Sequence, residues 1–322
     1  MKVAHWTLLN GSGMHRVAED LSVAEKALGI DSVLVQCDDS TKWSVGADAD
    51  IHVVHTHLPD FARRKDSKLV YVAHGTPEHV FKLSVQEGHL RGYGAGDYFM
   101  LAVHWIRNAD ATVVFWPRIQ ALWQQMCQKG RTIDCVPMGV DKEFWKPTLT
   151  QGKYAGTPSL LSAENCHDIK WPLDLIWMWP WITENVPEAR LHLLYVPKDE
   201  HRWWFPLLYG TDALFKMFVA GNAFAPVDLR NAFNSVDFYV GLVRYGDFNK
   251  VCLEAKASGC KVISYVGNEY ADYWVPEGDQ RVIAQEIEKI LKGEIAPRQC
   301  ADIPSREDTA KGMIAIYNRI LC

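Results

Sequence analysis

Short apolar runs alternate with helical patterns along the first half of the chain. Residues 3–9 form an apolar run typical of a buried strand, and apolar positions with helical spacing then continue to a stop at Gly29. Further strand-like runs lie at 32–36, 51–56, 69–74, 111–115 and 133–137. Strands that alternate with helices in this way predict a parallel sheet covered by helices on both faces.

The same alternation restarts in the second half of the chain. Residues 146–152 lose periodicity and are typical of a linker, and strand-like runs then lie at 159–163, 189–196, 216–220, 236–242 and 261–265. The pattern predicts an α/β protein with two doubly wound, Rossmann-like domains and an interdomain cleft. We expect the first domain at 1–148 and the second at 149–303, with a helix at 304–322 that is a candidate to pack back on the first domain.

Length, charge and cysteine content narrow the classes of function. The 322 residues exceed one core of usual size, and the net charge of −5 argues against a generally basic nucleic-acid-binding surface. The eight cysteines show no metal-ligand spacing. No apolar run approaches the roughly 18 residues that span a bilayer, and no signal-peptide pattern precedes the first strand. We therefore expect a cytoplasmic protein without integral membrane association.

The segment 241–264 carries the most informative chemistry. A buried strand ends near Leu242, a turn containing Gly246 follows, and a helix begins near Asn249 and ends at Gly259. Ligands of such folds lie at the carboxyl ends of the strands, where a helix N-terminus attracts phosphate. Glu254 can accept two hydrogen bonds from a diol such as a ribose. The alternative is an ordinary strand–turn–helix with a surface glutamate.

This segment resembles the donor site of retaining glycosyltransferases of the GT-B fold, the family that includes sucrose synthases and bacterial mannosyltransferases. That family has a Gly-Phe-Gly followed by Leu-Glu-Ala-Met-Ala-x-Gly. Here the matching residues are Asp247-Phe248-Asn249 and then Leu253-Glu254-Ala255-Lys256-Ala257-Ser258-Gly259. Further similar motifs occur in the family's order: Gly11-Ser12-Gly13, His55-Thr56-His57, His74-Gly75, and Val136-Pro137-Met138-Gly139-Val140-Asp141 with Phe144 and Pro147.

The resemblance implies a donor site for a nucleoside-diphosphate sugar and no metal cofactor. The residues it assigns to donor binding are Gly11, Ser12, Gly13, Lys170, Arg244, Gly246, Asp247, Phe248, Asn249, Lys250 and Glu254. Lys170, Asp247 and His74 are the implied catalytic residues, and His74 is expected to position the sugar. In this family the leaving phosphate helps to deprotonate the acceptor, so no protein nucleophile is required.

Two departures from the family leave the sugar open, whether hexose or pentose. Gly246 stands where the family has its first glutamate, with Asp247 next to it. The family's arginine before Lys170 is absent, and Arg244 or Lys250 can supply the lost charge. A catalytically inactive nucleotide-sugar-binding protein is therefore an alternative.

The acceptor is expected on the first domain, beside the Gly- and His-rich stretch 76–97. The dense basic cluster nearby, with one arginine from that stretch, makes up the candidate acceptor-binding residues Arg63, Arg64, Lys65 and Arg91. The chain resembles glycosyltransferases of tailed phages, some of which glycosylate hydroxymethylated pyrimidines in DNA. Modified DNA, in the host cytoplasm if the origin is a phage, is one candidate acceptor, and a cell-surface polysaccharide or lipid-linked precursor is the rival. Asp48-Ala49-Asp50 matches a metal motif of another glycosyltransferase fold but is expected to be a polar turn.

Overall fold

The structure is a computed structural model of the chain. It describes residues 1–8, 13–56, 58, 64–81, 97–127, 130–148, 154, 156–163, 173–194, 217–219, 226–243 and 250–322. These residues form two compact units, one made of Met1–Asp141 with Pro304–Cys322 and the other of Lys142–Ile303. The division lies seven residues before the boundary expected at 148, because the segment at 139–141 pairs with the residues that begin the last helix.

The first unit contains a parallel sheet of six strands in the described part of the chain. Its order is β2-β1-β3-β4-β5-β6. The strands are β1 (Lys2–Thr7), β2 (Asp31–Gln36), β3 (Ile51–Val54), β4 (Lys68–Val72), β5 (Ala111–Val114) and β6 (Asp134–Cys135). All of β3 and β5, and five of the six residues of β1, are buried, as expected for strands covered on both faces.

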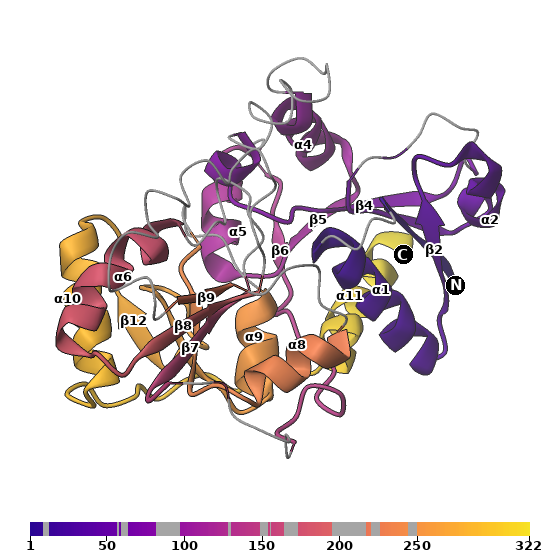
Figure 1. Cartoon of the computed structure of the whole chain (residues 1–322). Helices are drawn as coiled ribbons and strands as arrows, with labels where there is room; N and C mark the ends of the chain where they lie inside the picture. The colour runs from indigo at the N-terminus through magenta and orange to yellow at the C-terminus, as the bar shows by residue number, and fades with distance from the viewer. Residues whose placement is uncertain are drawn as a thin grey trace. The chain divides into compact units, whose positions relative to one another are not determined.

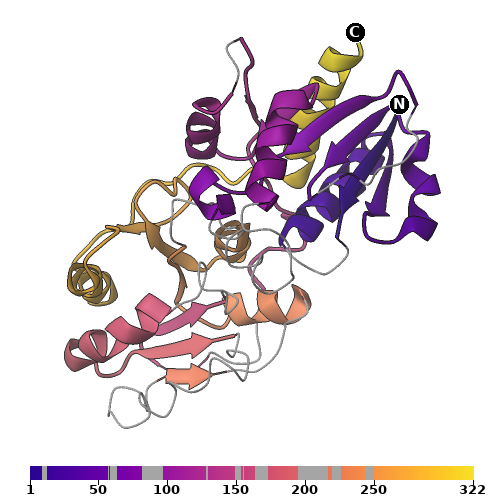
Figure 2. The same ribbon diagram turned by 90° about the horizontal axis from the view of Figure 1, so that it is seen from above.

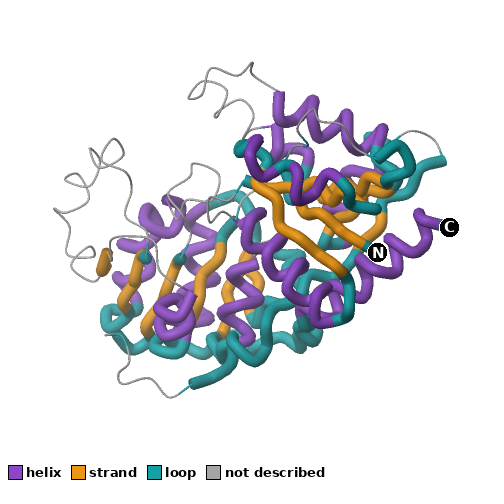
Figure 3. Tube along the Cα trace, turned by 90° about the vertical axis from the view of Figure 1, so that its right-hand side faces the viewer, coloured by secondary structure: helices purple, strands orange, loops and turns teal. Residues whose placement is uncertain are grey.

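The helices of the first unit cover this sheet. They are α1 (Gly13–Ala27), α2 (Ser44–Ala47), α4 (Asp97–Asn108), α5 (Pro117–Gln124) and α11 (Arg306–Leu321), with a short 3₁₀ turn at Ser40–Lys42. In Figure 1 the yellow α11 lies beside α1, although nearly 300 residues separate them in the chain. Figure 3 shows the strands as orange tubes flanked by purple helices.

A specific junction attaches α11 to the first unit. Val140 forms a parallel β-bridge with Ser305, and Ser305 begins α11 with a capping box that it shares with Asp308. Thr309 accepts a hydrogen bond from the Gly139 amide at 2.8 Å and donates one to the Pro137 carbonyl at 2.9 Å. The last helix is thus part of the first unit.

The second unit repeats the architecture. Its parallel sheet has the order β12-β11-β10-β7-β8-β9. The strands are β7 (Ser159–Ser162), β8 (Arg190–Leu193), β9 (Met217–Val219), β10 (Phe238–Gly241), β11 (Lys261–Tyr265) and β12 (Tyr273–Val275). Figure 2 shows β7, β8 and β9 side by side as pink to salmon arrows. The strand-like runs of the sequence predict all of them except β12, which is only three residues long.

Helices pack on both faces of this second sheet. They are α6 (Leu173–Asn185), α8 (Pro226–Phe233), α9 (Lys250–Ala257) and α10 (Gln280–Leu291). Figure 1 shows α6 and α10 on one side and α8 and α9 on the other. Alternate residues of β10 face the two layers: Phe238 and Val240 join the core with α6 and α10, whereas Tyr239 packs against Phe233 of α8.

Candidate functional site

The helix α9 lies very close to the strand that precedes it. A Cβ added at Gly241, the last residue of β10, would come within 2.7 Å of the Cys252 sulfur on α9. The Gly241 carbonyl also accepts a hydrogen bond from Ser264 of β11 at 3.1 Å. Glycine at this position therefore lets α9 begin at the carboxyl edge of the sheet, where a parallel α/β unit binds ligands.

Glu254, which is buried, and Lys250, which is half-buried, form a pair on α9. The side chains are 3% and 12% exposed, and Lys250 Nζ lies 3.4 Å from Glu254 Oε1. The spacing of four residues places both on one face of the helix. Removing a carboxylate and an ammonium group from water costs free energy, which their mutual attraction often does not fully offset. Such a pair therefore adds little to the stability of the fold and is a candidate for ligand binding. A surface position for Glu254, the alternative left open by the sequence, does not apply.

The remaining residues of the predicted donor site are mostly not described. Gly13 is the first residue of α1 and is exposed, and a Cβ added to it would meet no atom within 4 Å. The other predicted positions lie outside the described residues: Gly11, Ser12, Lys170, Arg244, Gly246, Asp247, Phe248 and Asn249. The structure thus joins Lys250 with Glu254 and leaves the other assignments as predictions.

Three histidines meet at the carboxyl edge of the first sheet. His74 follows β4 and is half-buried, whereas His55 and His5 are buried. His74 Nε2 lies 2.9 Å from His55 Nδ1, and His55 Nε2 lies 3.0 Å from His5 Nδ1. The histidines predicted after β3 and β4 are therefore joined through hydrogen-bonded rings, while His57 lies outside the described residues.

A buried carboxylate ends this row of histidines. Glu25 of α1 accepts a hydrogen bond from His5 Nε2 at 2.8 Å, from the Ser32 hydroxyl at 2.7 Å and from the Tyr317 hydroxyl at 2.8 Å. Sequence reasoning missed His5 and Glu25. The available signals were a histidine inside an apolar strand and a glutamate four residues after Leu21 on the apolar face of α1.

Burial and hydrogen bonding shift the pKa of Glu25 in opposite directions. Burial raises its pKa, but the charge and hydrogen bond of His5, with the hydrogen bonds of Ser32 and Tyr317, outweigh burial and leave the pKa below its ordinary value. Burial lowers the pKa of His55 well below its ordinary value, and the neighbouring His74 and His5 lower it further. The row therefore has an anionic end at Glu25 and a neutral centre at His55.

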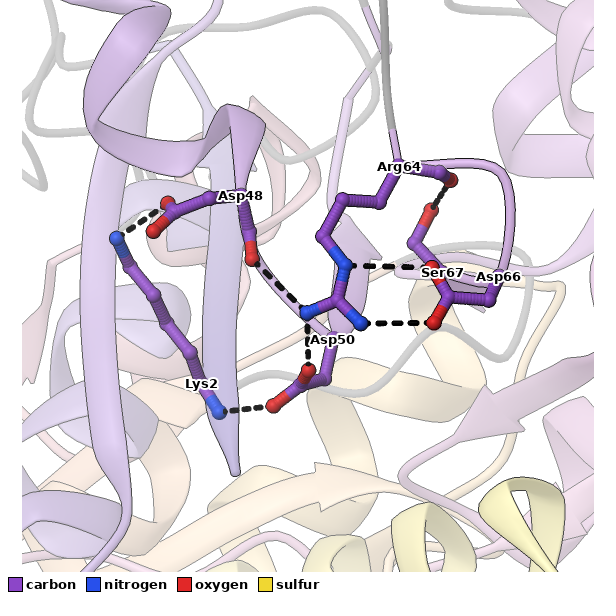
Figure 4. A network of polar contacts seen from close by, with 6 residues as sticks. All are labelled: Lys2, Asp48, Asp50, Arg64, Asp66 and Ser67. Carbon is purple, nitrogen blue, oxygen red and sulfur yellow. Dashed lines mark hydrogen bonds and ion pairs between the residues drawn. The ribbon is translucent and has the colours of Figure 1, made fainter.

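The predicted basic cluster takes part in a network of ion pairs. Arg64 donates to Asp66 through Nε and Nη2 at 3.2 and 2.8 Å, and to Asp50 through Nη1 at 2.7 Å (Figure 4). Lys2 bonds to Asp48 through its ammonium group and to Asp50 through its backbone amide. These contacts neutralise much of the positive charge expected from Arg64.

The other candidate acceptor residues are Lys65, Arg63 and Arg91. Lys65 is exposed, and Arg63 and Arg91 lie outside the described residues. The polar turn expected at Asp48-Ala49-Asp50 contributes both of its carboxylates to the network with Lys2 and Arg64.

In the described part of the chain, no three His, Cys, Asp or Glu residues are grouped so that they could hold a metal ion. No helix among the described residues is both long and apolar enough to cross a bilayer.

Comparison with solved structures decides the fold. A sucrose-phosphate synthase from Thermosynechococcus elongatus superimposes with a TM-score of 0.70 at 14% identity, over 100% of this chain and 96% of that chain. The chain has the GT-B fold. A glycosyltransferase from Rickettsia africae shares this GT-B architecture with a TM-score of 0.65 at 12% identity, over 99% of this chain and 98% of that one.

A third GT-B structure was solved with a nucleotide sugar. HepE from Anabaena, in complex with UDP-glucose, matches with a TM-score of 0.63 at 11% identity, over 99% of this chain and 98% of that chain. No protein-family model matches the sequence. No curated protein sequence matches it either. The GT-B fold is thus established by structural similarity to proteins that share only 11–14% of their sequence with this chain.

Proposed function

We propose that this chain is a glycosyltransferase that moves a sugar from a nucleoside-diphosphate sugar to a hydroxyl group of an acceptor. The observation that carries the proposal is the ion pair of the buried Glu254 with the half-buried Lys250 on α9, the helix that begins just beyond the carboxyl end of β10. Glu254 binds the ribose hydroxyls, and the start of α9 binds the diphosphate. The GT-B fold, shared with a sucrose-phosphate synthase and with HepE bound to UDP-glucose, supports this reading.

The chemistry follows from the charge of the leaving group. Cleavage of the bond to the anomeric carbon leaves a nucleoside diphosphate, whose growing negative charge must be stabilised. Lys250 and the first amides of α9 contribute positive charge. Lys170 and Arg244, which the sequence predicts to bind the donor, are proposed to contribute further positive charge. The transfer proceeds with retention of configuration, as the resemblance implies. The alternative is an inactive nucleotide-sugar-binding protein, which is favoured by Gly246 in place of the family's first glutamate. Such a protein would bind the donor without hydrolysis or transfer.

Turnover is expected to survive chelation. Protein cations and helix amides provide the charge that a divalent ion supplies in other transferases, so an excess of EDTA should leave the rate of nucleoside diphosphate release within about twofold. The rate is measured before and after dialysis against EDTA, and then with added magnesium or manganese. Complete loss of turnover in EDTA that either ion restores would contradict this assignment of the leaving-group chemistry.

The acceptor is proposed to carry a hydroxyl group, and hydroxymethylated pyrimidine in DNA is one member of that class. If DNA is the acceptor, phosphate contacts from Arg63, Arg64, Lys65 and Arg91 make binding fall steeply with salt. The pairing of Arg64 with Asp50 and Asp66 weighs against this acceptor. A cell-surface polysaccharide or a lipid-linked precursor also offers a hydroxyl group, and its binding does not require that basic cluster.

A triple variant with Arg63, Arg64 and Lys65 changed to alanine separates these acceptors. On modified DNA we expect it to lose transfer at least tenfold while donor binding stays unchanged, because α9 belongs to the other unit. The assay offers matched DNA with and without hydroxymethylpyrimidine and records an added hexose or pentose mass. No mass shift with any nucleotide sugar, together with transfer to a glycan or lipid, eliminates DNA as the acceptor.

A further inference from the structure

A lysine, an aspartate and a cysteine meet beside α9 in the second unit. Lys256 of α9 donates a hydrogen bond from Nζ to Asp272 Oδ1, and the same Nζ lies 3.7 Å from the sulfur of Cys300, 44 positions further along the chain. Cys300 Sγ lies 3.9 Å from Asp272 Oδ1, so the three side chains form a triangle. Lys256 and Glu254 are two residues apart and therefore lie on opposite faces of the helix. The cluster is thus separate from the candidate donor site.

Backbone contacts hold the aspartate and the cysteine in place. Asp272 Oδ2 accepts a hydrogen bond from the Val262 amide of β11 at 2.8 Å. The Arg298 amide donates to the Asp272 carbonyl at 2.8 Å, and the Arg298 guanidinium lies 3.2 Å from the centre of the Trp274 ring. The segment that carries Cys300 is therefore fixed against the residues between β11 and β12, and the sulfur is held next to the lysine.

The thiol hydrogen of Cys300 has acceptors on the backbone. Sγ donates to the Ala271 carbonyl oxygen at 3.2 Å and is within 3.5 Å of the Arg298 carbonyl oxygen. A lysine ammonium group only donates, so the sulfur receives the Lys256 contact through a lone pair. An amine nitrogen and a thiol sulfur thus face each other, beside a carboxylate that can take up a proton.

A small molecule can reach this pair of side chains. The Lys256 side chain is 23% exposed and Cys300 is half-buried, whereas Cys252 and Cys260 of the same unit are 1% and 3% exposed. Lysine at position 256 is also a departure from the glycosyltransferase motif that the segment resembles, which has methionine there. The GT-B fold and the proposed glycosyl transfer therefore do not account for the cluster.

We propose that Lys256 and Cys300 form a covalent N–O–S cross-link with molecular oxygen as the oxidant. The O–O bond breaks, and one oxygen atom is inserted between Nζ and Sγ. The other oxygen atom leaves as water with one hydrogen from the nitrogen and the hydrogen of the thiol. Nitrogen and sulfur each lose two electrons, and these four electrons reduce the oxygen molecule. Asp272 accepts the remaining proton that the ammonium group gives up and passes it to solvent.

The cross-link ties α9 to the segment that follows α10. At 3.7 Å the nitrogen and the sulfur are in contact, and an inserted oxygen atom requires a smaller approach than a direct bond between them. The segment with Cys300 leads to Pro304, where the chain enters the first unit. The bond closes a loop within the second unit, which lowers the conformational entropy of the unfolded state and so stabilises the folded one.

Peptide mass spectrometry of the whole chain tests the bond. The chain carries Cys322→Ser, which removes an exposed cysteine, and is kept in air-saturated buffer or without oxygen in excess dithiothreitol. After digestion with chymotrypsin we expect the oxygenated sample to contain the peptides of Lys256 and Cys300 joined, with the added mass of one oxygen atom less two hydrogens. Dithiothreitol should restore the separate peptides, with the oxygen atom released as water.

Other products of oxidation overturn the proposal. Joined peptides that have lost two hydrogens without gaining oxygen show a direct nitrogen–sulfur bond. Oxygen bound to Cys300 alone shows ordinary thiol oxidation, and unchanged peptides in air-saturated buffer show no reaction at this site. Each of these three results contradicts the N–O–S cross-link.

Three variants and one control identify the atoms that react. Lys256→Met supplies the residue of the motif and removes the nitrogen, and Cys300→Ser removes the sulfur, so neither should give joined peptides. Asp272→Asn keeps an oxygen for the Val262 amide but is a poorer proton acceptor, so the joined product should form at least tenfold more slowly. Lys289→Met, at an exposed position of α10, should react like the wild type. Joined peptides in Lys256→Met, or an undiminished rate in Asp272→Asn, overturn the proposal.

Thermal unfolding provides a second readout that needs no nucleotide sugar. The midpoint for the second unit should rise by at least about 5 °C in the cross-linked chain compared with the reduced chain, and Lys256→Met should show no such rise. An equal midpoint in the cross-linked and reduced chains contradicts the stabilising role of the bond. Because neither measurement involves a donor, failure of the cross-link leaves the proposed glycosyl transfer unaffected, and the reverse also holds.

Discussion

Replacing Glu254 with alanine is expected to weaken nucleoside diphosphate binding at least tenfold. The carboxylate is 3% exposed on α9 and lies 3.4 Å from Lys250 at its Oε1 atom. Charge-assisted hydrogen bonds to a ribose are each worth about 1.5–3 kcal/mol, and a tenfold loss corresponds to about 1.4 kcal/mol. Isothermal titration calorimetry of the whole chain with UDP, GDP, ADP and TDP measures the change.

Two further variants separate binding from folding. Glu254→Gln keeps the size of the side chain and one accepting oxygen, so we expect it to bind more weakly than the wild type and more tightly than Glu254→Ala. Glu286→Ala, at a half-buried position of α10 in the same unit where Glu286 pairs with Lys289, should leave the affinity unchanged. Circular dichroism checks that each variant is folded. Equal affinity in wild type and folded Glu254→Ala contradicts the assignment of α9 to the donor.

Replacing Gly139 with alanine is expected to destabilise the first unit strongly. An added Cβ would lie 2.0 Å from the Ser305 carbonyl oxygen and 2.8 Å from the Arg306 amide nitrogen, and backbone atoms cannot move aside as a flexible side chain can. The bridge between Val140 and Ser305 would open, and α11 would lose its attachment next to the cap. We expect the free energy of unfolding of the first unit to fall by about 3 kcal/mol.

Gly13→Ala is the matched control for this substitution. A Cβ at Gly13 meets no atom within 4 Å, so its unfolding free energy should change by less than about 1 kcal/mol. Urea unfolding, followed by tryptophan fluorescence and by protection of the α11 amides from hydrogen exchange, compares the two variants. Equal stability of Gly139→Ala and Gly13→Ala would show that the junction with α11 is not formed as described.

The strands were predictable because parallel sheets leave a simple trace in the sequence. Continuous apolar runs such as that of β3 occur where both faces of a strand are covered, and the two helical layers follow from the alternation. The strand β12 was missed because its three residues are too few to show a period. The two compact units divide after Asp141 and not after the expected 148, because the bridge of Val140 with Ser305 joins residues 165 positions apart, which no local pattern reveals.

The candidate site was predictable only where a motif is local. Glu254 and Lys250 follow from the turn and helix after one strand, and His55 and His74 from strand ends. His5 and Glu25 were not, because their contact depends on the packing of α1 against β1. Arg64 was expected to face a ligand, yet its carboxylate partners include Asp50, fourteen residues earlier and brought near by the sheet.

This GT-B chain is proposed to use a nucleoside-diphosphate sugar as its donor. The most direct measurement is the release of nucleoside diphosphate from a panel of UDP-, GDP-, ADP- and TDP-sugars, with the wild type and Glu254→Ala at equal concentration. We predict that the wild type releases the diphosphate from at least one donor, and that Glu254→Ala reduces this release at least tenfold at a subsaturating donor concentration. A folded wild-type chain that neither binds nor cleaves any of these donors would contradict the proposed use of a nucleotide sugar.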